Sequence, residues 1–307
     1  MTWLAWRQQR LTWLIVAIVF TAVLSVSAYG HWRVANLIQQ ADVFKASEGY
    51  NDIFTDSQLV AILIPPLVGI FLGVSLFAPE IEHNTHVLVL TQSVSRLRWF
   101  FVKIAYAAVA AVAAGGLQSI AFDWSWSQYI AALDQSWVDP MTLGARGVDP
   151  AAYTLLATVA GAAAGLLIRR TLSAVAITIG VFAVVRVGGM FAWLSLVPTR
   201  QDVRQLPGAY PAPPRDSFAF FVDGGFILND GQRLLNYDPV YQDIIGSCPV
   251  DTVADKCLVE NGVAAEFIRY YSTDQFAAIQ AVDAGLAIAI SFILLAIGAF
   301  WVRKRTH

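Results

Sequence analysis

The sequence predicts an all-α polytopic membrane protein: six transmembrane helices, both termini in the cytosol, and a small mixed extracellular domain between helices five and six. Three observations predict this class: 57% of the 307 residues are hydrophobic, only 14% are charged, and the mean hydropathy is +0.58. Soluble domains contain roughly 45–50% apolar and about 25% charged residues. The composition therefore excludes a disordered chain, a disulfide-dense secreted scaffold and a nucleic-acid-binding protein with a basic face.

Six apolar runs are long enough to cross a bilayer, which takes roughly 20 mostly apolar residues. They are Leu11–Tyr29, Gln58–Ala78, Trp99–Ser119, Ala151–Ile168, Leu172–Leu196 and Ala281–Val302. The first run follows two arginines and so has the alternative interpretation of a secretory signal peptide. We expect an uncleaved span instead, because the run is longer than the usual apolar region of about 7–15 residues.

The charges on the connections predict the orientation in the membrane. Residues 1–10, 79–98, 169–171 and the basic tail 303–307, together with Lys103, hold 10 basic and 2 acidic residues. The other connections (30–57, 120–150 and 197–280) hold 9 basic and 19 acidic residues. Because cytoplasmic loops are enriched in Lys and Arg, the first group is expected to face the cytosol.

The largest outer connection, 197–280, is expected to be a small domain rather than a linker. It contains the turn signals Asp223-Gly224-Gly225 and Asn229-Asp230-Gly231. The apolar stretches Phe218–Phe221 and Phe226–Leu228 around the first signal predict a hairpin. Cys248 and Cys257 also lie here, and outside the cytosol we expect them to form a disulfide, with two free buried thiols as the alternative.

The residue patterns of common enzyme classes are missing from the sequence. No lysine follows a glycine, so the G-K-[ST] ending of a P-loop is absent, and no G-x-S-x-G motif occurs. His83 and His86 have a spacing that suits a metal on a helix, but they lack the HExxH order of a zinc hydrolase. We therefore expect no catalytic residue, no metal site and no cofactor in this chain.

The connection 79–98 has the pattern of a short amphipathic helix on the inner face. Pro79 suits the first turn of a helix, and Glu80 and Glu82 suit its positive end. Arg96 and Arg98 follow at the other end. A helix held between two spans is a lever that a cytosolic partner can push, and the alternative is an ordinary anchored loop.

The same segment resembles the E-x-E-x-G-T…T-Q-S-x-[ST]-R-x-R-W…K stretch of ABC-2-type transporter permeases, especially the actinobacterial group. The matching residues are Glu80, Glu82, Thr85, Thr91, Gln92, Ser93, Arg96, Arg98, Trp99 and Lys103. Further similar stretches are Met1–Arg10, Val148–Tyr153, Gly161…Gly165…Arg169-Arg170-Thr171, and the set Tyr270, Phe276, Gln280 and Asp283. Departures from the residues common in that group occur at Pro79, Asn84, Ser272 and Asp283.

The resemblance implies an architecture of two permeases, as a homodimer, with two ABC ATP-binding subunits that carry ATP and Mg. Glu80–Trp99 would form the coupling helix, and residues 1–10 would form an interfacial elbow helix with Trp3, Trp6, Arg7 and Arg10. Transmembrane helices one to five would lie within residues 11–196 and helix six would be 281–302, in an actinobacterial plasma membrane. The chain would contact lipid and would not bind nucleic acid.

The function implied by the resemblance is export, driven by ATP hydrolysis in the separate subunit. The expected cargo is a hydrophobic or amphipathic compound such as an antibiotic, a peptide or a lipid, as in multidrug or antimicrobial peptide resistance. The alternative is a sensor or assembly component whose extracellular domain binds a ligand or surface partner and signals through the ATPase.

One charge lies within a predicted span. Arg186 follows Arg170 by 16 residues, or roughly 24 Å along a helix, which places it in the outer part of span five. Asp283 and Asp123 are its expected partners. We favour a structural ion pair over a contact with the cargo.

Glycines and prolines within the spans predict where helices pack closely and where one of them bends. Close helix approach is predicted at Gly69, Gly73, Gly161, Gly165 and Gly188-Gly189. Pro65-Pro66 is predicted to kink span two.

Overall fold

The chain forms two units, each described separately below. The computed structural model describes residues 17–18, 21, 24–33, 35–36, 43–82, 95–126, 138–208, 220–248 and 254–305. The helical unit comprises Met1–Leu133, Pro140–Leu196 and Ala278–His307, and the sheet domain comprises Asp134–Asp139 and Val197–Ala277.

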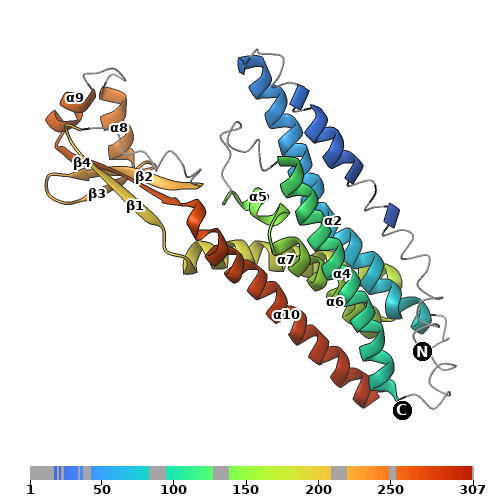
Figure 1. The fold of residues 1–307 in the computed structure, drawn as a ribbon. Coiled ribbons are helices and arrows are strands. Elements are labelled where there is room, and N and C mark those ends of the chain that lie inside the picture. The colour runs from blue at the N-terminus through green and yellow to red at the C-terminus, as the bar shows by residue number, and fades with distance from the viewer. Residues whose placement is uncertain are drawn as a thin grey trace. The chain divides into compact units, whose positions relative to one another are not determined.

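Long apolar helices make up the described part of the helical unit (Figure 1). They are α2 (Val43–Glu82), α4 (Arg96–Trp126), α6 (Asp149–Ile168), α7 (Thr171–Leu196) and α10 (Phe276–Arg305), with the short α5 (Pro140–Ala145) before α6.

Among the described residues, five stretches are long and apolar enough to cross a membrane: Phe54–Glu82, Arg96–Trp126, Asp149–Ile168, Thr171–Leu196 and Thr273–Lys304. They cover predicted spans two to six, so the predicted class, a polytopic membrane protein, is confirmed. The first predicted span lies mostly outside the described residues, and the described residues between 17 and 33 are helical.

Helix α6 is the central helix of this unit and packs against α2, α4 and α7. Of its most apolar stretch 78% is buried, compared with 22% for α7 and for α10. The tightest approach is between α2 and α6, where a Cβ added at Gly69 or Gly73 would overlap the backbone of Ala157 or Thr158. This confirms the predicted close packing of these glycines, which brings the two helices into direct backbone contact.

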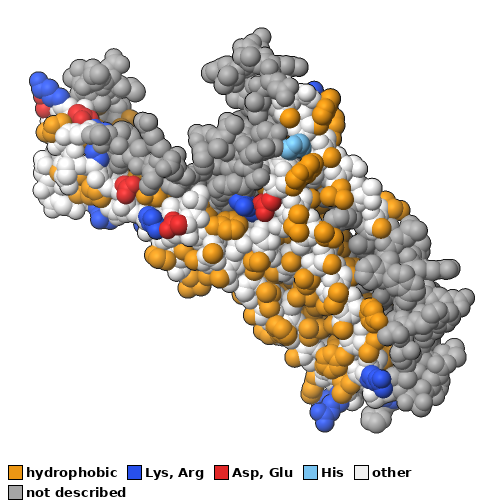
Figure 2. All heavy atoms as spheres, in the orientation of Figure 1, with side chains coloured by type: hydrophobic (Ala, Val, Ile, Leu, Met, Phe, Trp, Pro, Cys, Tyr) orange, Lys and Arg blue, Asp and Glu red, His pale blue; other side chains and the backbone are white. Residues whose placement is uncertain are grey.

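Large apolar side chains cover the outer surfaces of the helical unit, and the visible face in Figure 2 is rich in them. Val184 of α7 is 72% exposed and Phe292 of α10 is 67% exposed. Contiguous apolar surface of this kind is suited to lipid or to another membrane-spanning chain, not to water.

The sheet domain is built on an antiparallel sheet with the strand order β1-β4-β2-β3. The strands are β1 (Arg200–Gln205), β2 (Phe220–Leu228), β3 (Arg233–Leu235) and β4 (Val263–Tyr271), and α8 (Pro239–Ser247) and α9 (Ala254–Glu260) lie between β3 and β4 in the chain. Residues of both helices join the strands in one apolar core, made of Phe226, Leu234, Ile244, Leu258 and Val263. The Cys248–Cys257 disulfide is present and connects the end of α8 to α9.

The hairpin predicted around Asp223-Gly224-Gly225 is wrong. These three residues lie inside β2 and pair with β4, and the chain turns instead at the second signal, Asn229-Asp230-Gly231, between β2 and β3. The reason is tertiary: Gly225 permits a close approach to the Leu234 carbonyl of β3, and Asp223 forms an ion pair with Arg269 of β4.

Candidate functional site

The last turn of α2 and the first turns of α4 form one end of the helical unit, called here the Glu80 end. Lys103 of α4 is only 7% exposed, and its Nζ lies 2.5 Å from Glu80 Oε1 and donates to the Leu76 carbonyl at 3.2 Å. The ammonium also lies 5.1 Å from the centre of the Trp99 ring. A lysine that is this deeply buried needs a partner of opposite charge. Glu80 precedes residues 83–94 in the chain and Lys103 follows them, so this ion pair connects the end of α2 to the start of α4.

Glu82 connects the same end to α7. Its Oε2 accepts hydrogen bonds from Thr171 Oγ1 at 2.6 Å and from the Thr171 backbone N–H at 3.2 Å. Because Thr171 is the first residue of α7, the carboxylate satisfies an N–H group that the helix itself leaves without a partner. The two glutamates therefore link α2 to α4 and to α7.

The predicted coupling residues fall into two groups. Glu80 and Glu82 lie in the last turn of α2, and Arg96, Arg98 and Trp99 lie in the first turn of α4, where Trp99 is buried. Thr85, Thr91, Gln92 and Ser93 lie outside the described residues, as do the elbow residues Trp3, Trp6, Arg7 and Arg10.

The expectation that Pro79 begins a new helix is wrong. Helix α2 continues through Pro65-Pro66 and through Pro79 to Glu82. Proline removes one helical hydrogen bond, but Ala78 beside it is fully buried against α6, and the contacts of Glu80 and Glu82 fix the following turn. Tertiary contacts therefore extend the helix beyond the point where the local sequence favours a break.

A second polar cluster lies among α6, α7 and α10. Arg186 Nη1 of α7 lies 2.7 Å from Asp283 Oδ2 of α10, and Arg186 Nη2 donates to the Pro140 carbonyl at 2.9 Å. Tyr153 of α6 donates its hydroxyl to Asp283 Oδ1 at 2.6 Å, and its ring lies 4.8 Å from the guanidinium carbon. The structure thus brings Arg186 together with one of its two expected partners.

Two glycines, which have no side chain, provide the space that the side chains of this cluster occupy. A Cβ at Gly189 would overlap Asp283 and the Tyr153 hydroxyl, and a Cβ at Gly144 would overlap the Arg186 guanidinium. By contrast, no atom of the described residues lies within 4 Å of a Cβ added at Gly188. Of the predicted pair Gly188-Gly189, only Gly189 therefore serves close packing in this unit.

The other expected partner, Asp123, does not contact Arg186 and pairs instead with Arg146 at 2.9 Å. Burial lowers the pKa of the Arg146 guanidinium, and the Asp123 charge opposes this shift. Gln280 of α10 fixes the same connection, because its amide donates to the Arg146 carbonyl at 2.7 Å and accepts from the Val148 N–H at 3.1 Å. The competing arginine outside the spans explains why Asp123 is unavailable to Arg186.

The cluster also includes Asp149 of α6, whose carboxyl group lies near Asp283 and Arg186. Neither Tyr153 nor Asp149 was among the partners expected for Arg186. A signal for them exists: Asp149 and Tyr153 stand four residues apart at the start of an apolar helix, which places two polar side chains on one helix face.

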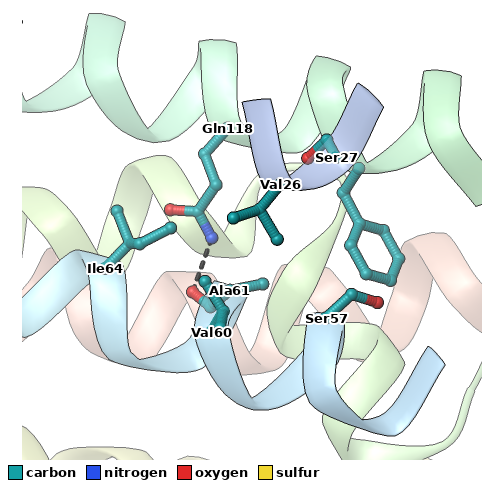
Figure 3. A pocket seen from close by; sticks show the side chains of 8 residues that line it. Val26, Ser27, Ser57, Val60, Ala61, Ile64 and Gln118 are labelled. Carbon is teal, nitrogen blue, oxygen red and sulfur yellow. Dashed lines mark hydrogen bonds between the residues drawn. The ribbon is translucent and has the colours of Figure 1, made fainter. Parts of the chain in front are cut away.

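A small pocket lies between α2, α4 and the helical residues 24–33 (Figure 3). Gln118 of α4 points into it and donates to the Ala61 carbonyl of α2 at 2.6 Å. The lining residues are Val26, Ser27, Ser57, Val60, Ala61, Ile64, Gln118 and Phe122. This pocket contains no charged side chain, and its one amide is engaged in holding α2 to α4.

The part of the chain that the structure describes contains no group of three or more His, Cys, Asp or Glu residues able to hold a metal ion.

A family model described as ABC-2 membrane transporter related matches residues 2–193, which is more than half of the chain. The protein belongs to this family. It is therefore a multi-pass membrane component of an ABC transporter, and it works with an ABC ATP-binding subunit. The match ends within α7, so the four strands of the sheet domain and α10 lie outside it. No curated protein and no solved structure matched the chain.

Proposed function

We propose that this ABC-2 protein is the permease of an exporter, and that its Glu80 end faces the cytosol and receives the motion of two ATPase subunits. The observation that carries the proposal is the linkage of α2, α4 and α7 by Glu80 and Glu82 within the stretch that resembles the coupling region. The basic bias of the connections at this end and the disulfide in the sheet domain both support the orientation, since disulfides persist outside the cytosol.

The linkage suggests how a push would spread through the permease. Residues 83–94 join α2 directly to α4, so a force on them acts on both helices. The Glu82–Thr171 contact passes the same force to the start of α7. Closure of the ATPases would thereby tilt three helices together and switch the access of the cargo path from the inside to the outside.

The expected cargo is a hydrophobic or amphipathic compound. The extensive apolar surface of α7 and α10 supports this class, because such cargo can approach through the lipid. We assign Arg186 and Asp283 to a structural ion pair: Asp283 is 1% exposed, and both of its oxygens already accept hydrogen bonds within the protein.

A sensor or assembly role is the second candidate, and one observation favours it. The strands and small helices of the sheet domain lie outside the matched family region, and they have their own apolar core and disulfide. A domain of this kind is suited to binding a ligand or a surface partner.

The test is reconstitution of the permease with its ATPase subunit in vesicles, with transport and ATP hydrolysis measured against a chemically broad library. An exporter accumulates a compound on the sheet-domain side while that compound stimulates hydrolysis. A sensor shows stimulated hydrolysis without accumulation.

In the exporter, the double variant Glu82→Arg with Arg96→Glu should insert normally but lose the stimulation of ATP hydrolysis by the cargo, whereas Glu260→Arg on the exposed end of α9 should keep it. Unchanged stimulation in the double variant would contradict the proposed role of the Glu80 end.

A further inference from the structure

The described residues of the polar cluster among α6, α7 and α10 include one more acid than base. Asp149 and Asp283 are 0% and 1% exposed, and Arg186 is the cation that both carboxyl groups face. If both acids were ionised, the cluster would hold a net negative charge inside an apolar helical unit. Burying such a charge without a partner is strongly unfavourable.

The hydrogen bonds show which of the two acids is the anion. Asp283 accepts from the Arg186 guanidinium through one oxygen and from the Tyr153 hydroxyl through the other. Both contacts stabilise a carboxylate. Asp283 is therefore the ionised partner of Arg186, and the charge of Arg186 is matched by it.

Asp149 is in a different situation. Neither of its oxygens meets a hydrogen-bond donor among the described residues, although the side chain is completely buried. It lies against Asp283, so its nearest charged neighbour on α10 is another acid. Among the described residues, the charged groups that act on Asp149 are Asp283 from α10 and Arg186 from α7. The Tyr153 hydroxyl of α6 donates to Asp283, and Gln280 of α10 is engaged with Arg146 and Val148.

Two other ways to stabilise the buried Asp149 side chain, the helix dipole and a bound cation, are less favourable than a proton. Asp149 stands in the first turn of α6, where the helix dipole favours an anion, but this effect is small beside the cost of a buried, unpaired carboxylate. A divalent cation would require further ligands, and the described residues offer no group of three.

We propose that Asp149 is a proton-binding site. In this conformation it is a neutral carboxylic acid, and its hydroxyl donates to the ionised Asp283, which leaves the cluster without net charge. A conformation that admits water to the cluster lets Asp149 release this proton to solvent, so the equilibrium between the two conformations depends on pH.

Infrared spectroscopy of the full-length protein in lipid bilayers tests the proposal. Aspartate carrying a carbon-13 label in its side-chain carboxyl identifies the carbonyl band of a protonated aspartic acid, even without a variant. We expect this band at neutral pH, its loss in Asp149→Asn, and its retention in Asp123→Asn, whose acid is paired one-to-one with Arg146. Absence of the labelled band from the unmodified protein, or its persistence in Asp149→Asn, would overturn the assignment.

Thermal unfolding gives an independent reading. Asparagine copies a neutral aspartic acid in shape and charge and takes up no proton on folding, so Asp149→Asn should not lower the melting temperature at neutral pH. Asp283→Asn should lower it, because Arg186 then lacks its anion. At alkaline pH the unmodified protein should lose more of its melting temperature than Asp149→Asn does. An equal loss in Asp149→Asn and Asp283→Asn at neutral pH would show that Asp149 is ionised and would refute the proposal.

Discussion

At the scale of single residues, the charged cluster depends on two positions where even one added carbon atom, a Cβ, would overlap its side chains. Gly189 and Gly144 make the space in which Arg186, Asp283 and Tyr153 meet. Asp283 accepts both a guanidinium and a phenol, so each of its oxygens has a defined donor. Three helices are thereby fixed to one another through a single carboxylate.

Gly189→Ala should displace Asp283 and destabilise the helical unit, because the added Cβ overlaps the carboxylate. Overpacking of a tight core costs about 1–3 kcal/mol. The matched control is Gly188→Ala, whose Cβ has no neighbour within 4 Å among the described residues and which should leave stability unchanged. Thermal unfolding of both variants in the same membrane mimetic measures the difference, and equal melting temperatures would contradict the described geometry.

Asp283→Asn should destabilise the protein more than the loss of the whole pair does. Removing one partner of a buried ion pair costs about 3–5 kcal/mol, since the other charge remains buried. The double variant Arg186→Met with Asp283→Leu replaces both charges by apolar groups and should recover part of this loss. If the double variant folds and hydrolyses ATP but no longer transports, Arg186 contacts the cargo and the structural assignment fails.

At the scale of elements, the α2–α6 contact organises the helical unit, and the disulfide organises the small helices of the sheet domain. Gly73 of α2 approaches the Thr158 carbonyl of α6 so closely that no side chain fits between them. In the sheet domain, Cys248 and Cys257 are nine residues apart and connect α8 to α9 beside the apolar core.

Gly73→Ala should separate α2 from α6 and lower the stability of the helical unit by about 1–3 kcal/mol. Gly116→Ala on α4 is the control, because no described residue lies within 4 Å of its Cβ position. Unfolding of the two variants by heat or denaturant checks the expectation. A neutral Gly73→Ala would mean that α2 and α6 do not touch through their backbones.

Replacement of both cysteines by serine should loosen the sheet domain by about 2–3 kcal/mol, as expected for the loss of a short disulfide loop. Hydrogen exchange of the full-length protein should then become faster in β4 and α9, while α6 stays protected. Alkylation before reduction should label neither cysteine in the native protein. Two labelled thiols would restore the alternative of free cysteines.

At the scale of the whole molecule, the two carboxylates of the Glu80 end hold together the three helices that we propose to move as a group. Glu80 holds α4 through Lys103, and Glu82 holds α7 through Thr171. The family membership makes this protein one part of a larger machine, so these contacts are best tested in the assembled transporter.

Thr171→Val should weaken the coupling between cargo and ATP hydrolysis, because it removes the hydroxyl that Glu82 binds and keeps the size of the side chain. The loss of one hydrogen bond predicts a decrease of about twofold to tenfold in cargo-stimulated ATPase activity. Thr178→Val is the control on the same helix, since within the part of the chain that the structure describes its hydroxyl bonds to the Ala174 carbonyl of α7 itself and to no other element. Equal effects of the two variants would argue against transmission through Glu82.

The sequence by itself determined the membrane class, five of the spans seen in the structure, the family resemblance and the disulfide. These features are local: a span needs a run of apolar residues, and a short loop already brings Cys248 near Cys257. The resemblance likewise rests on short motifs, and the family match bears it out over residues 2–193.

Only the tertiary structure decided which acid meets Arg186, where β2 turns, and how far α2 continues beyond Pro79. Asp283 is 97 residues from Arg186 and Tyr153 is 130 residues from Asp283, so the cluster exists only once three helices have packed. The same holds for Asp149, because the groups beside its buried carboxyl, Asp283 and Arg186, come from two other helices. Charge and hydrophobicity along the chain predict what enters the membrane, but helix packing determines which charges meet there.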